Sequence, residues 1–291
     1  MALIVTPLQP MFAAEISGVD LEHALDSRIA AQIVDAMNQY AVCIYRPGKP
    51  LSNEAHIALG KMLGPIDTVP VFKIAGRGKS RLPPELNDAS NIDENNEIMK
   101  ENSRLIMFRR GDRLWHSDMS FHPNRAVYSL LSAHEIPPVG ADTEFADMRA
   151  AYDALPHERK AEIEGLVAIH SIWHSRQLAG YPNPTDEELA SRPPTPQKLV
   201  QTVPGSGRKT LYLASHASHI EGWPHERGAA LLADLTQFAT QAQFVYRHRW
   251  RVGDLVIWDN RCTMHRGTDY EDTRYRRDVR RATTRENAIS A

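Results

Sequence analysis

The hydrophobic pattern predicts a chain built mainly from short β-strands. Short runs of apolar and β-branched residues recur between clusters of glycine, proline, asparagine and aspartate, which is typical of strands joined by turns. The predicted strands are residues 4–6, 13–16, 41–45, 127–134, 142–146, 166–169, 199–203, 210–213, 244–250, 255–258 and 277–284.

Apolar side chains at helical spacing predict several helices. The first follows an N-cap at Asp26 or Ser27 and places Ile29, Ile33 and Met37 on one face. The other predicted helices are residues 52 or 53 to 62, 148–155, 156–164 and 226–240. Because the helices lie at the beginning of the chain or between strands, we expect a mainly β fold with helical insertions. The predicted architecture is a double-stranded β-helix (jelly roll) rather than a parallel α/β sheet.

Two irregular segments interrupt this pattern. Residues 76–112 contain few apolar side chains and lead directly to the candidate site described below, so we interpret them as an active-site lid or, alternatively, as a mobile insertion without a role. Residues 181–196 form a proline-rich surface insertion. VAIHSIWH (167–174) is predicted to be a strand. With these insertions, we expect residues 1–291 to form a single domain.

Composition narrows the classes of partner. The 291 residues are 42% apolar and 24% charged, with a net charge of −2, so there is no electrostatic reason to expect nucleic acid or an anionic membrane as partner. Cys43 and Cys262 form no CxxC motif and fit a reducing compartment. No apolar run predicts a signal peptide or a transmembrane helix. We expect a cytoplasmic homo-oligomer that acts on a small acidic molecule.

The candidate chemistry centres on LWHSDMSF, residues 114–121. His116 and Asp118 are two residues apart, so an extended chain would direct both side chains to the same face. Two donors do not hold a metal alone, and WDNRCTMHRG (258–267) supplies a third, His265, after a short apolar strand. Two histidines and one carboxylate on one side of a metal form the facial arrangement of non-haem Fe(II) oxygenases.

Other metal-binding and nucleotide-binding patterns fit the sequence less well. A closed structural zinc site would favour thiolates, and the chain contains no HExxH motif. GRGKS (76–80) ends like a phosphate-binding loop, but Lys73 stands where its first glycine is required. The remaining candidate histidines are predicted to pack or form hydrogen bonds, or, in LASHASHIEGW (213–223), either to line a pocket or to lie in a plain loop. These histidines are His170, His174, His216 and His219.

The segment RYRRDVRRATT (274–284) is rich in arginine. Such clusters are usually a solvated face or a nucleic-acid patch. Arg277 and Arg281, however, are four residues apart, so on a strand they point the same way, and a guanidinium suits a carboxylate. Arginines near an open iron site would imply an acidic co-substrate.

Together, LWHSDMSF, GADTEFADMRAAYDALP, FVYRHRW, VGDLVIWDNRCTMHRG and RRATT resemble the taurine/2,4-dichlorophenoxyacetate (TauD/TfdA) family of Fe(II)- and 2-oxoglutarate-dependent dioxygenases. The resemblance covers essentially the whole chain and is strongest to the 2,4-dichlorophenoxyacetate members. It implies a double-stranded β-helix in which His116, Asp118 and His265 hold Fe(II), with 2-oxoglutarate and dioxygen as co-substrates. It also implies that Thr143 and an arginine bind the distal carboxylate of 2-oxoglutarate.

The identity of that arginine depends on the alignment. Family members usually place it eleven residues after the last histidine, at Arg276 here, whereas alignment on RRATT selects Arg277. We follow RRATT because strand phase is harder to change than loop length. Arg281 then faces the near carboxylate of 2-oxoglutarate or the substrate acid. Lys73 matches a lysine that contacts the substrate carboxylate in the phenoxyacetate enzymes, and its alternative is an exposed lysine.

The resemblance implies that oxidative decarboxylation of 2-oxoglutarate to succinate is coupled to hydroxylation of a C–H bond. If the hydroxylated carbon bears an ether oxygen, the product falls apart to a phenol and an oxoacid. We therefore expect a dioxygenase acting on a small organic acid, with an aryloxyalkanoate first. The alternatives are a sulfonate or other carboxylate hydroxylase of the same family, or a metal-binding jelly roll that binds a ligand without turnover. The near-neutral charge does not favour a nucleic-acid-binding protein.

Overall fold

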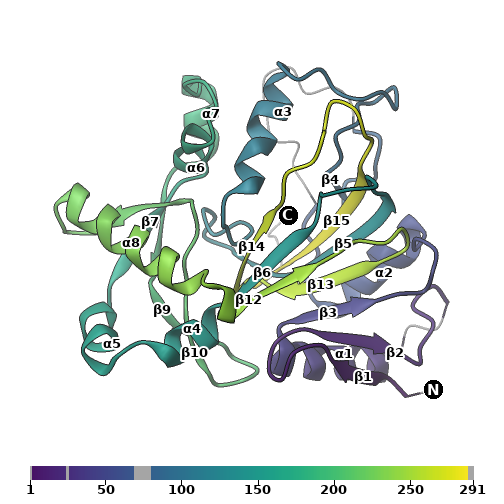
Figure 1. Ribbon diagram of the computed structural model, residues 1–291, viewed down its shortest axis with the longest axis horizontal. Coiled ribbons are helices and arrows are strands. Elements are labelled where there is room, and N and C mark those ends of the chain that lie inside the picture. Colours follow the sequence, from purple (N-terminus) through teal and green to yellow (C-terminus); the bar gives the residue numbers. More distant parts are fainter. Residues whose placement is uncertain (1, 24–25, 69–79, 288–291) are drawn as a thin grey trace.

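The computed structural model describes residues 2–23, 26–68 and 80–287, and two β-sheets form its centre (Figure 1). Their strands are β1 (Ile4–Pro7), β2 (Ala14–Ser17), β3 (Val42–Tyr45), β4 (Asn87–Asp88), β5 (Ala126–Glu135), β6 (Thr143–Asp147), β12 (Val245–His248), β13 (Leu255–Asp259), β14 (Thr263–Gly267) and β15 (Asp278–Arg285). The larger sheet has the order β1-β2-β3-β13-β5-β15-β4 and the smaller one β12-β6-β14. Paired strands are antiparallel, except that β2 and β3 are parallel. The predicted mainly β fold is confirmed.

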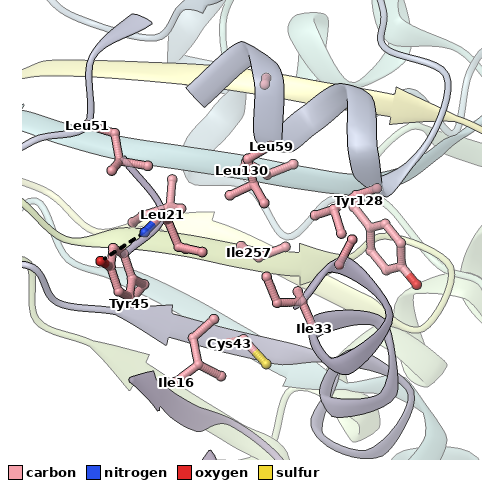
Figure 2. Packing of buried hydrophobic residues seen from close by; sticks show 14 of the residues in the cluster. Ile16, Leu21, Ile33, Cys43, Tyr45, Leu51, Leu59, Tyr128, Leu130 and Ile257 are labelled. Atoms are coloured by element: carbon pink, nitrogen blue, oxygen red, sulfur yellow. Dashed lines mark hydrogen bonds between the residues drawn. The ribbon is translucent and has the colours of Figure 1, made fainter. Parts of the chain in front are cut away.

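Two helices cover one face of the larger sheet. α1 (Ser27–Tyr40) and α2 (Asn53–Leu63) begin close to the predicted positions, because the side chains of Asp26 and Ser52 accept hydrogen bonds from amides of the first turn. Their apolar faces pack on the sheet in the core that Figure 2 shows. The residues labelled there are Ile16, Leu21, Ile33, Cys43, Tyr45, Leu51, Leu59, Tyr128, Leu130 and Ile257.

The alternation of side chains along β5 and β13 divides them between two cores. Leu130 and Ile257 point into the helix-covered core, whereas Leu131 and Trp258 point into a second core between the two sheets. Phe145 of β6 meets Trp258 there, with ring centroids 5.5 Å apart. The two sheets therefore face each other, as expected for a jelly roll.

A layer of helices and short strands flanks the smaller sheet (Figure 1). Its elements are α4 (Met148–Ala154), α5 (His157–Ile163), β7 (Val167–His170), α6 (Ile172–Leu178), α7 (Asp186–Ser191), β8 (Thr195–Lys198), β9 (Val200–Thr202), β10 (Lys209–Leu211), β11 (Ala217–Ile220) and α8 (His225–Ala239). Strands β9 and β10 form the predicted hairpin. Met264 of β14 is fully buried in the core of this layer, so the next side chain along β14, His265, points the opposite way.

Three local predictions were wrong. VAIHSIWH is not one strand, because β7 ends at His170 and α6 begins at Ile172. LASHASHIEGW is not a plain loop, since it contains β11, which pairs with β7. The part of the 76–112 segment that the structure describes is not irregular throughout: it includes β4, α3 (Arg104–Arg109) and the 3-10 helix η1 (Arg110–Arg113). In each case tertiary packing overrode a weak local pattern.

The proline-rich insertion also has more structure than its composition predicts. It contains α7 and the start of β8, and Glu188 is buried, where it accepts hydrogen bonds from Arg104 and Tyr181. In the part of the chain that the structure describes, no helix combines the length and the apolar character needed to cross a membrane.

Candidate metal centre and its two cavities

His116, Asp118 and His265 converge in the interior. One ligand atom from each lies within 4.8 Å of the others, and all three residues are buried. His116 Nε2 is 3.9 Å from Asp118 Oδ1, and His265 Nε2 is 3.8 Å from Asp118 Oδ2. These separations are too long for hydrogen bonds, so the three side chains aim at a shared point rather than at each other. In the described part of the chain, this is the only cluster with metal-ligand geometry.

The backbone brings the two histidines together. His116 and His265 form an isolated antiparallel bridge, with N···O distances of 3.0 and 2.8 Å in the two directions. The pair therefore extends the edge of the smaller sheet at β14. Asp118 does not continue an extended strand, as the two-residue spacing had predicted, because a turn begins there and Met119 has φ 53°. The carboxylate nevertheless reaches the same point as the imidazoles.

Both oxygens of Asp118 are held by neighbours. Arg281 Nη1 donates to Oδ1 at 2.6 Å, and Ser129 Oγ donates to Oδ2 at 2.7 Å. Asn260 Nδ2 in turn donates to Ser129 Oγ at 2.9 Å, and Asn260 Oδ1 accepts from the Asp118 amide at 3.1 Å. Asn260 therefore fixes the loop and the carboxylate together. Sequence reasoning gave it no role, although its place in the WDNR motif was a signal.

The protonation states suit metal binding. Burial raises the pKa of the Asp118 carboxyl, but the Arg281 guanidinium and the two nearby imidazoles outweigh burial, and the pKa falls to about 2. Burial, with His116 beside it, lowers the pKa of His265 to about 3. His116 Nδ1 lies 2.8 Å from the carbonyl oxygen of Leu114, so the Nδ1–H tautomer leaves Nε2 as a free electron-pair donor. An ionised carboxylate, a neutral His265 ring and the Nε2 electron pair of His116 form a donor set that fits Fe(II).

A cavity of about 130 Å³ adjoins the cluster on one side. His116, His265, Thr143 and Arg277 are among its lining residues. Arg277 Nε is buried without a hydrogen-bond partner among the described residues, and burial lowers the pKa of its guanidinium. We call this space the arginine cavity. A half-buried guanidinium with an unused buried donor, in a cavity that a threonine hydroxyl also lines, is suited to bind a carboxylate.

The structure distinguishes the two possible arginine phases. Arg277 and Arg281 both line the arginine cavity. Arg276 instead pairs with Glu135 and Asn96, and Arg280 pairs with Asp278 and Asn53. Odd-numbered positions of this segment face the space between the sheets, as Val279 does, because side chains alternate along β15. Arg277 and Arg281 therefore lie on the side of the segment that faces the cavity, and their roles in binding a co-substrate stay a prediction.

A second cavity, of about 110 Å³, lies on the other side of Arg281 and Asp118. Apolar side chains from several elements line it: Leu105, Phe108, Met119, Phe121 and Ile172. The buried residues His216 and Arg176 also line it and pack against the rings of Phe121 and Phe108, and we call this space the apolar cavity. His116, Asp112 and Arg281 border both cavities. The cluster thus stands between the arginine cavity and a second cavity whose wall combines aromatic and aliphatic side chains with charged ones, among them Asp67, Glu85, Asp88 and Asp112.

The other sequence candidates lie in varied places. His216 is one that the sequence left open: it lines the apolar cavity, and burial lowers the pKa of its ring well below the usual value. His170 is buried and hydrogen-bonded to Ser120, as predicted. His174 and His219 line neither cavity. Lys73 lies outside the described residues.

Comparison with known proteins identifies the family. Residues 4–283 match the family model described as "Taurine catabolism dioxygenase TauD, TfdA family". The chain belongs to the TauD/TfdA family. The predicted resemblance is confirmed, and the family is one of dioxygenases.

Members of the TauD/TfdA family match along the entire chain. An alpha-ketoglutarate-dependent 2,4-dichlorophenoxyacetate dioxygenase from Cupriavidus pinatubonensis is 44% identical, covering 99% of this chain and 100% of the relative. An (S)-phenoxypropionate/alpha-ketoglutarate-dioxygenase from Sphingobium herbicidovorans is 34% identical, covering 94% and 92%. The crystal structure of AAD-2 in complex with Mn(II) and N-oxalylglycine superposes with a TM-score of 0.94 at 42% identity, covering all of both chains. The predicted jelly roll is confirmed by this likeness.

Proposed function

We propose that this protein is an Fe(II)- and 2-oxoglutarate-dependent dioxygenase that cleaves the ether bond of aryloxyalkanoic acids. The observation that carries the proposal is the position of the His116, Asp118 and His265 cluster between the arginine cavity and the apolar cavity. One cavity suits a dicarboxylate and the other suits an acid with an aromatic body. The named activities of the family members at 44% and 34% identity support the same class of substrate.

The three side chains would hold Fe(II) through His116 Nε2, an Asp118 oxygen and His265. The donor set fits the ion, since two neutral imidazoles and one carboxylate are the facial set of non-haem iron sites. Asp118 is held by Arg281 and Ser129, which restrict its rotation before any metal arrives. Supporting hydrogen bonds of this kind orient ligands and raise metal affinity.

The arginine cavity would bind 2-oxoglutarate. Arg277 and Thr143 lie on its wall and would hold the distal carboxylate, and His116 and His265, two of the candidate metal ligands, line the same cavity. The crystallised neighbour with Mn(II) and N-oxalylglycine, an analogue of 2-oxoglutarate, supports this assignment. The charge of the buried guanidinium compensates the desolvation of the carboxylate.

The apolar cavity would bind the aryloxyalkanoate. Phe108 and Phe121 offer aromatic faces to the aryl ring, and the carboxylate would lie toward Arg281, at the border with the metal cluster. The ether-bearing carbon is then held near the cluster, between the two ends of the substrate. Lys73 remains a proposed further contact for the carboxylate, outside the described residues.

When bound, iron and 2-oxoglutarate supply the oxidising chemistry: dioxygen and 2-oxoglutarate are converted to succinate and carbon dioxide while one oxygen atom enters a substrate C–H bond. The chain's own residues orient the reactants and exclude water. Hydroxylation of the carbon beside the ether oxygen gives a hemiacetal, which separates into a phenol and an oxoacid. Placement of that carbon by Arg281 and the aromatic wall therefore decides which bond is cleaved.

A substrate screen tests the proposal. Purified enzyme with Fe(II), 2-oxoglutarate and dioxygen is offered 2,4-dichlorophenoxyacetate, both enantiomers of 2-phenoxypropionate, taurine and an alkyl sulfate, and succinate and phenol are quantified. We expect an aryloxyalkanoate to give the largest stimulation, with one phenol per succinate. Preference for taurine or the sulfate ester would replace the substrate assignment, and relatives named alkylsulfatase and sulfate ester dioxygenase make those two the informative competitors.

The His116→Ala variant tests the site itself. It removes one metal donor, and stimulated succinate formation should disappear while the melting temperature stays close to that of the parent protein. Turnover in this variant would refute the metal assignment. Ligand binding by the parent protein without any turnover would instead indicate a non-catalytic ligand-binding jelly roll.

We also infer that residues 76–112 act as a lid and that the single-domain protein works as a cytoplasmic homo-oligomer. The lid is supported by Leu105, Phe108 and Asp112, which line the cavities from α3 and η1. The buried free thiols of Cys43 and Cys262 are compatible with a reducing compartment. Light scattering of the purified protein measures the oligomeric state, and a monomer would contradict that part of the inference.

A further inference from the structure

The Thr143 hydroxyl has one hydrogen-bond partner among the residues that the structure describes, and that partner is an indole. Trp250 Nε1 lies 3.0 Å from Thr143 Oγ1, and both residues are buried. An indole N–H can only donate, whereas a hydroxyl donates one hydrogen bond and accepts up to two. Thr143 Oγ1 is therefore the acceptor in this pair, and its own proton has no acceptor in the described protein.

The position of Thr143 restricts where its hydroxyl proton can point. The hydroxyl cannot turn its proton toward the indole N–H without losing that hydrogen bond, and Thr143 lines the arginine cavity. A buried hydroxyl proton without an acceptor is unfavourable. A ligand oxygen in the arginine cavity would remove that cost, and Arg277 supplies the positive charge that such an anion needs.

We propose that Trp250 is a positioning residue for 2-oxoglutarate. By occupying one lone pair of Thr143 Oγ1, the indole turns the hydroxyl proton into the arginine cavity, where the distal carboxylate of 2-oxoglutarate accepts it. Trp250 does not line the cavity, so it acts through Thr143 alone. This inference rests on the proposed function, in which 2-oxoglutarate occupies the arginine cavity.

A similar arrangement, in which a hydroxyl accepts one hydrogen bond and donates another, is present beside the candidate metal ligands. Ser129 Oγ accepts a hydrogen bond from Asn260 Nδ2 at 2.9 Å and donates to Asp118 Oδ2 at 2.7 Å. There the acceptor is present in the protein, so both halves of the arrangement are visible. Thr143 likewise accepts a hydrogen bond, from Trp250 instead of an asparagine. A ligand carboxylate would supply the acceptor for the Thr143 proton, as Asp118 does for Ser129.

Trp250 is itself held in place. The ring of His248 packs edge-on against the Trp250 indole, with centroids 4.5 Å apart and an interplanar angle of 86°. His248 Nε2 is 3.1 Å from Asp254 Oδ2, and the same carboxylate oxygen accepts from the Arg251 amide at 3.0 Å. His248 is also the register partner of Thr143 in the β12–β6 pair. The contact with His248 and the pairing of β12 with β6 thus set the position of the indole donor relative to the hydroxyl.

The turn that carries Asp254 leaves little freedom. Gly253 has φ +94°, and a Cβ atom there would lie 2.6 Å from the Lys49 amide nitrogen. Only glycine fits that position without displacing the backbone. The turn that carries Asp254 is therefore packed closely against the backbone of Gly48 and Lys49.

The test measures ligand binding in the absence of turnover. Parent protein and Trp250→Phe are loaded with Mn(II) without oxygen and titrated calorimetrically with 2-oxoglutarate and, separately, with pyruvate. Pyruvate has the metal-chelating 2-oxo acid group but lacks the distal carboxylate. We expect the affinity for 2-oxoglutarate to fall about three- to tenfold, the loss of one well-oriented hydrogen bond, and the affinity for pyruvate to stay unchanged. In turnover, KM for 2-oxoglutarate should rise with kcat unchanged at saturation.

A double-mutant cycle separates positioning from packing. In a Thr143→Val background, Trp250→Phe should have no further effect on 2-oxoglutarate affinity, because the hydroxyl through which it acts is gone. Trp223→Phe is the matched control: its indole is half-buried, lies under Arg227 and lines neither cavity. This control should bind both ligands like the parent protein.

A second variant covers the case in which Trp250→Phe fails to fold. Incorporation of 3-benzothienylalanine at position 250 keeps the size of the ring system and replaces the N–H by sulfur. It should reproduce the selective loss for 2-oxoglutarate. Equal weakening of pyruvate and 2-oxoglutarate, or unchanged affinity for both, overturns the proposal.

Failure of the proposed function gives a different result. If the arginine cavity does not bind 2-oxoglutarate, Thr143→Val will leave its affinity unaltered or the parent protein will not bind it at all. If 2-oxoglutarate binds and Thr143→Val weakens it, but neither change at Trp250 does, the cavity assignment stands and the positioning role is refuted.

Discussion

Arg281 donates a hydrogen bond of 2.6 Å to Oδ1 of Asp118, so a cation that borders both cavities is tied directly to the carboxylate of the candidate metal centre. Arg281 Nε is buried and has no partner among the described residues. The guanidinium can therefore orient Asp118 with one edge and still offer a donor to an acidic ligand. In the proposed function, this geometry would link metal binding to recognition of the substrate.

Replacement of Arg281 tests its proposed role in binding the substrate carboxylate. Arg281→Gln removes the charge, and KM for the aryloxyalkanoate should rise by about tenfold or more, the range for a lost charge-assisted hydrogen bond. The measurement is steady-state phenol formation at saturating 2-oxoglutarate. Arg280→Gln is the control from the adjacent position, since Arg280 pairs with Asp278 and Asn53 away from the cavities. An equal effect of both changes would contradict the role of Arg281.

The phase of the arginines along β15 makes a second prediction. Arg277→Gln should raise KM for 2-oxoglutarate about tenfold or more, because the distal carboxylate loses its buried cation. Arg276→Gln should change it little, since Arg276 pairs with Glu135 and Asn96. Succinate formation at varied 2-oxoglutarate gives both values. A larger effect at Arg276 would support the alternative, eleven-residue alignment.

Leu105 should influence the choice of substrate. It is half-buried and lines the apolar cavity, and Leu105→Ala removes apolar contact with the aryl ring. We expect kcat/KM for 2,4-dichlorophenoxyacetate to fall about tenfold, since the change removes three carbons worth about 0.8 kcal/mol each when fully buried and Leu105 is half-buried. Binding of 2-oxoglutarate should not change. Met107→Ala, on the same helix and outside both cavities, is the control.

His56 predicts a dependence of stability on pH. Its ring is buried and Nε2 lies 3.0 Å from the carbonyl oxygen of Leu130, and burial lowers the pKa to about 4. The unfolded chain binds this proton near pH 6.5, so between these values the unfolded state holds more protons than the folded state. The contribution is present above about pH 6.5 and is lost as the pH falls toward 4.

The expected decrease between pH 7.5 and pH 5 is about 2 kcal/mol, because about 1.5 of the roughly 2.5 pKa units that separate the unfolded and folded states lie above pH 5. Urea unfolding at pH 7.5 and pH 5 measures the free energy of unfolding at each pH. The decrease should be smaller in His56→Gln, which has no ionisable group at that position. An undiminished decrease in this variant would assign the acid sensitivity to other buried groups, such as His134, whose pKa burial also lowers to about 4.

Local sequence determined most elements of this fold. The caps at Asp26 and Ser52, the alternating strands and the glycine-containing turns are short-range features, and the helices and strands they predict are present. The same patterns singled out His116, Asp118 and His265 as chemistry-bearing residues. Each of these signals depends on neighbours within a few positions, which is why a single sequence carries them.

Packing between distant segments decided the rest. The helix α6 and the strand β11 exist because they pack and pair with elements far along the chain, so VAIHSIWH and LASHASHIEGW misled the local reading. His216 lies in the second of these segments, and its place beside the apolar cavity depends on the same packing. The hydrophobic periodicity of the sequence does not predict that a residue such as His216 lines a cavity.

The tertiary structure likewise determines which site residues lie close together. His116 and His265 are brought together by backbone hydrogen bonds at the edge of the smaller sheet, and Trp250 reaches Thr143 only because β12 pairs with β6. The sequence determined which residues carry the chemistry, because chemical identity is local. Only the tertiary structure decided which of them share a cavity, because long-range strand pairing is set by the packing of the whole chain.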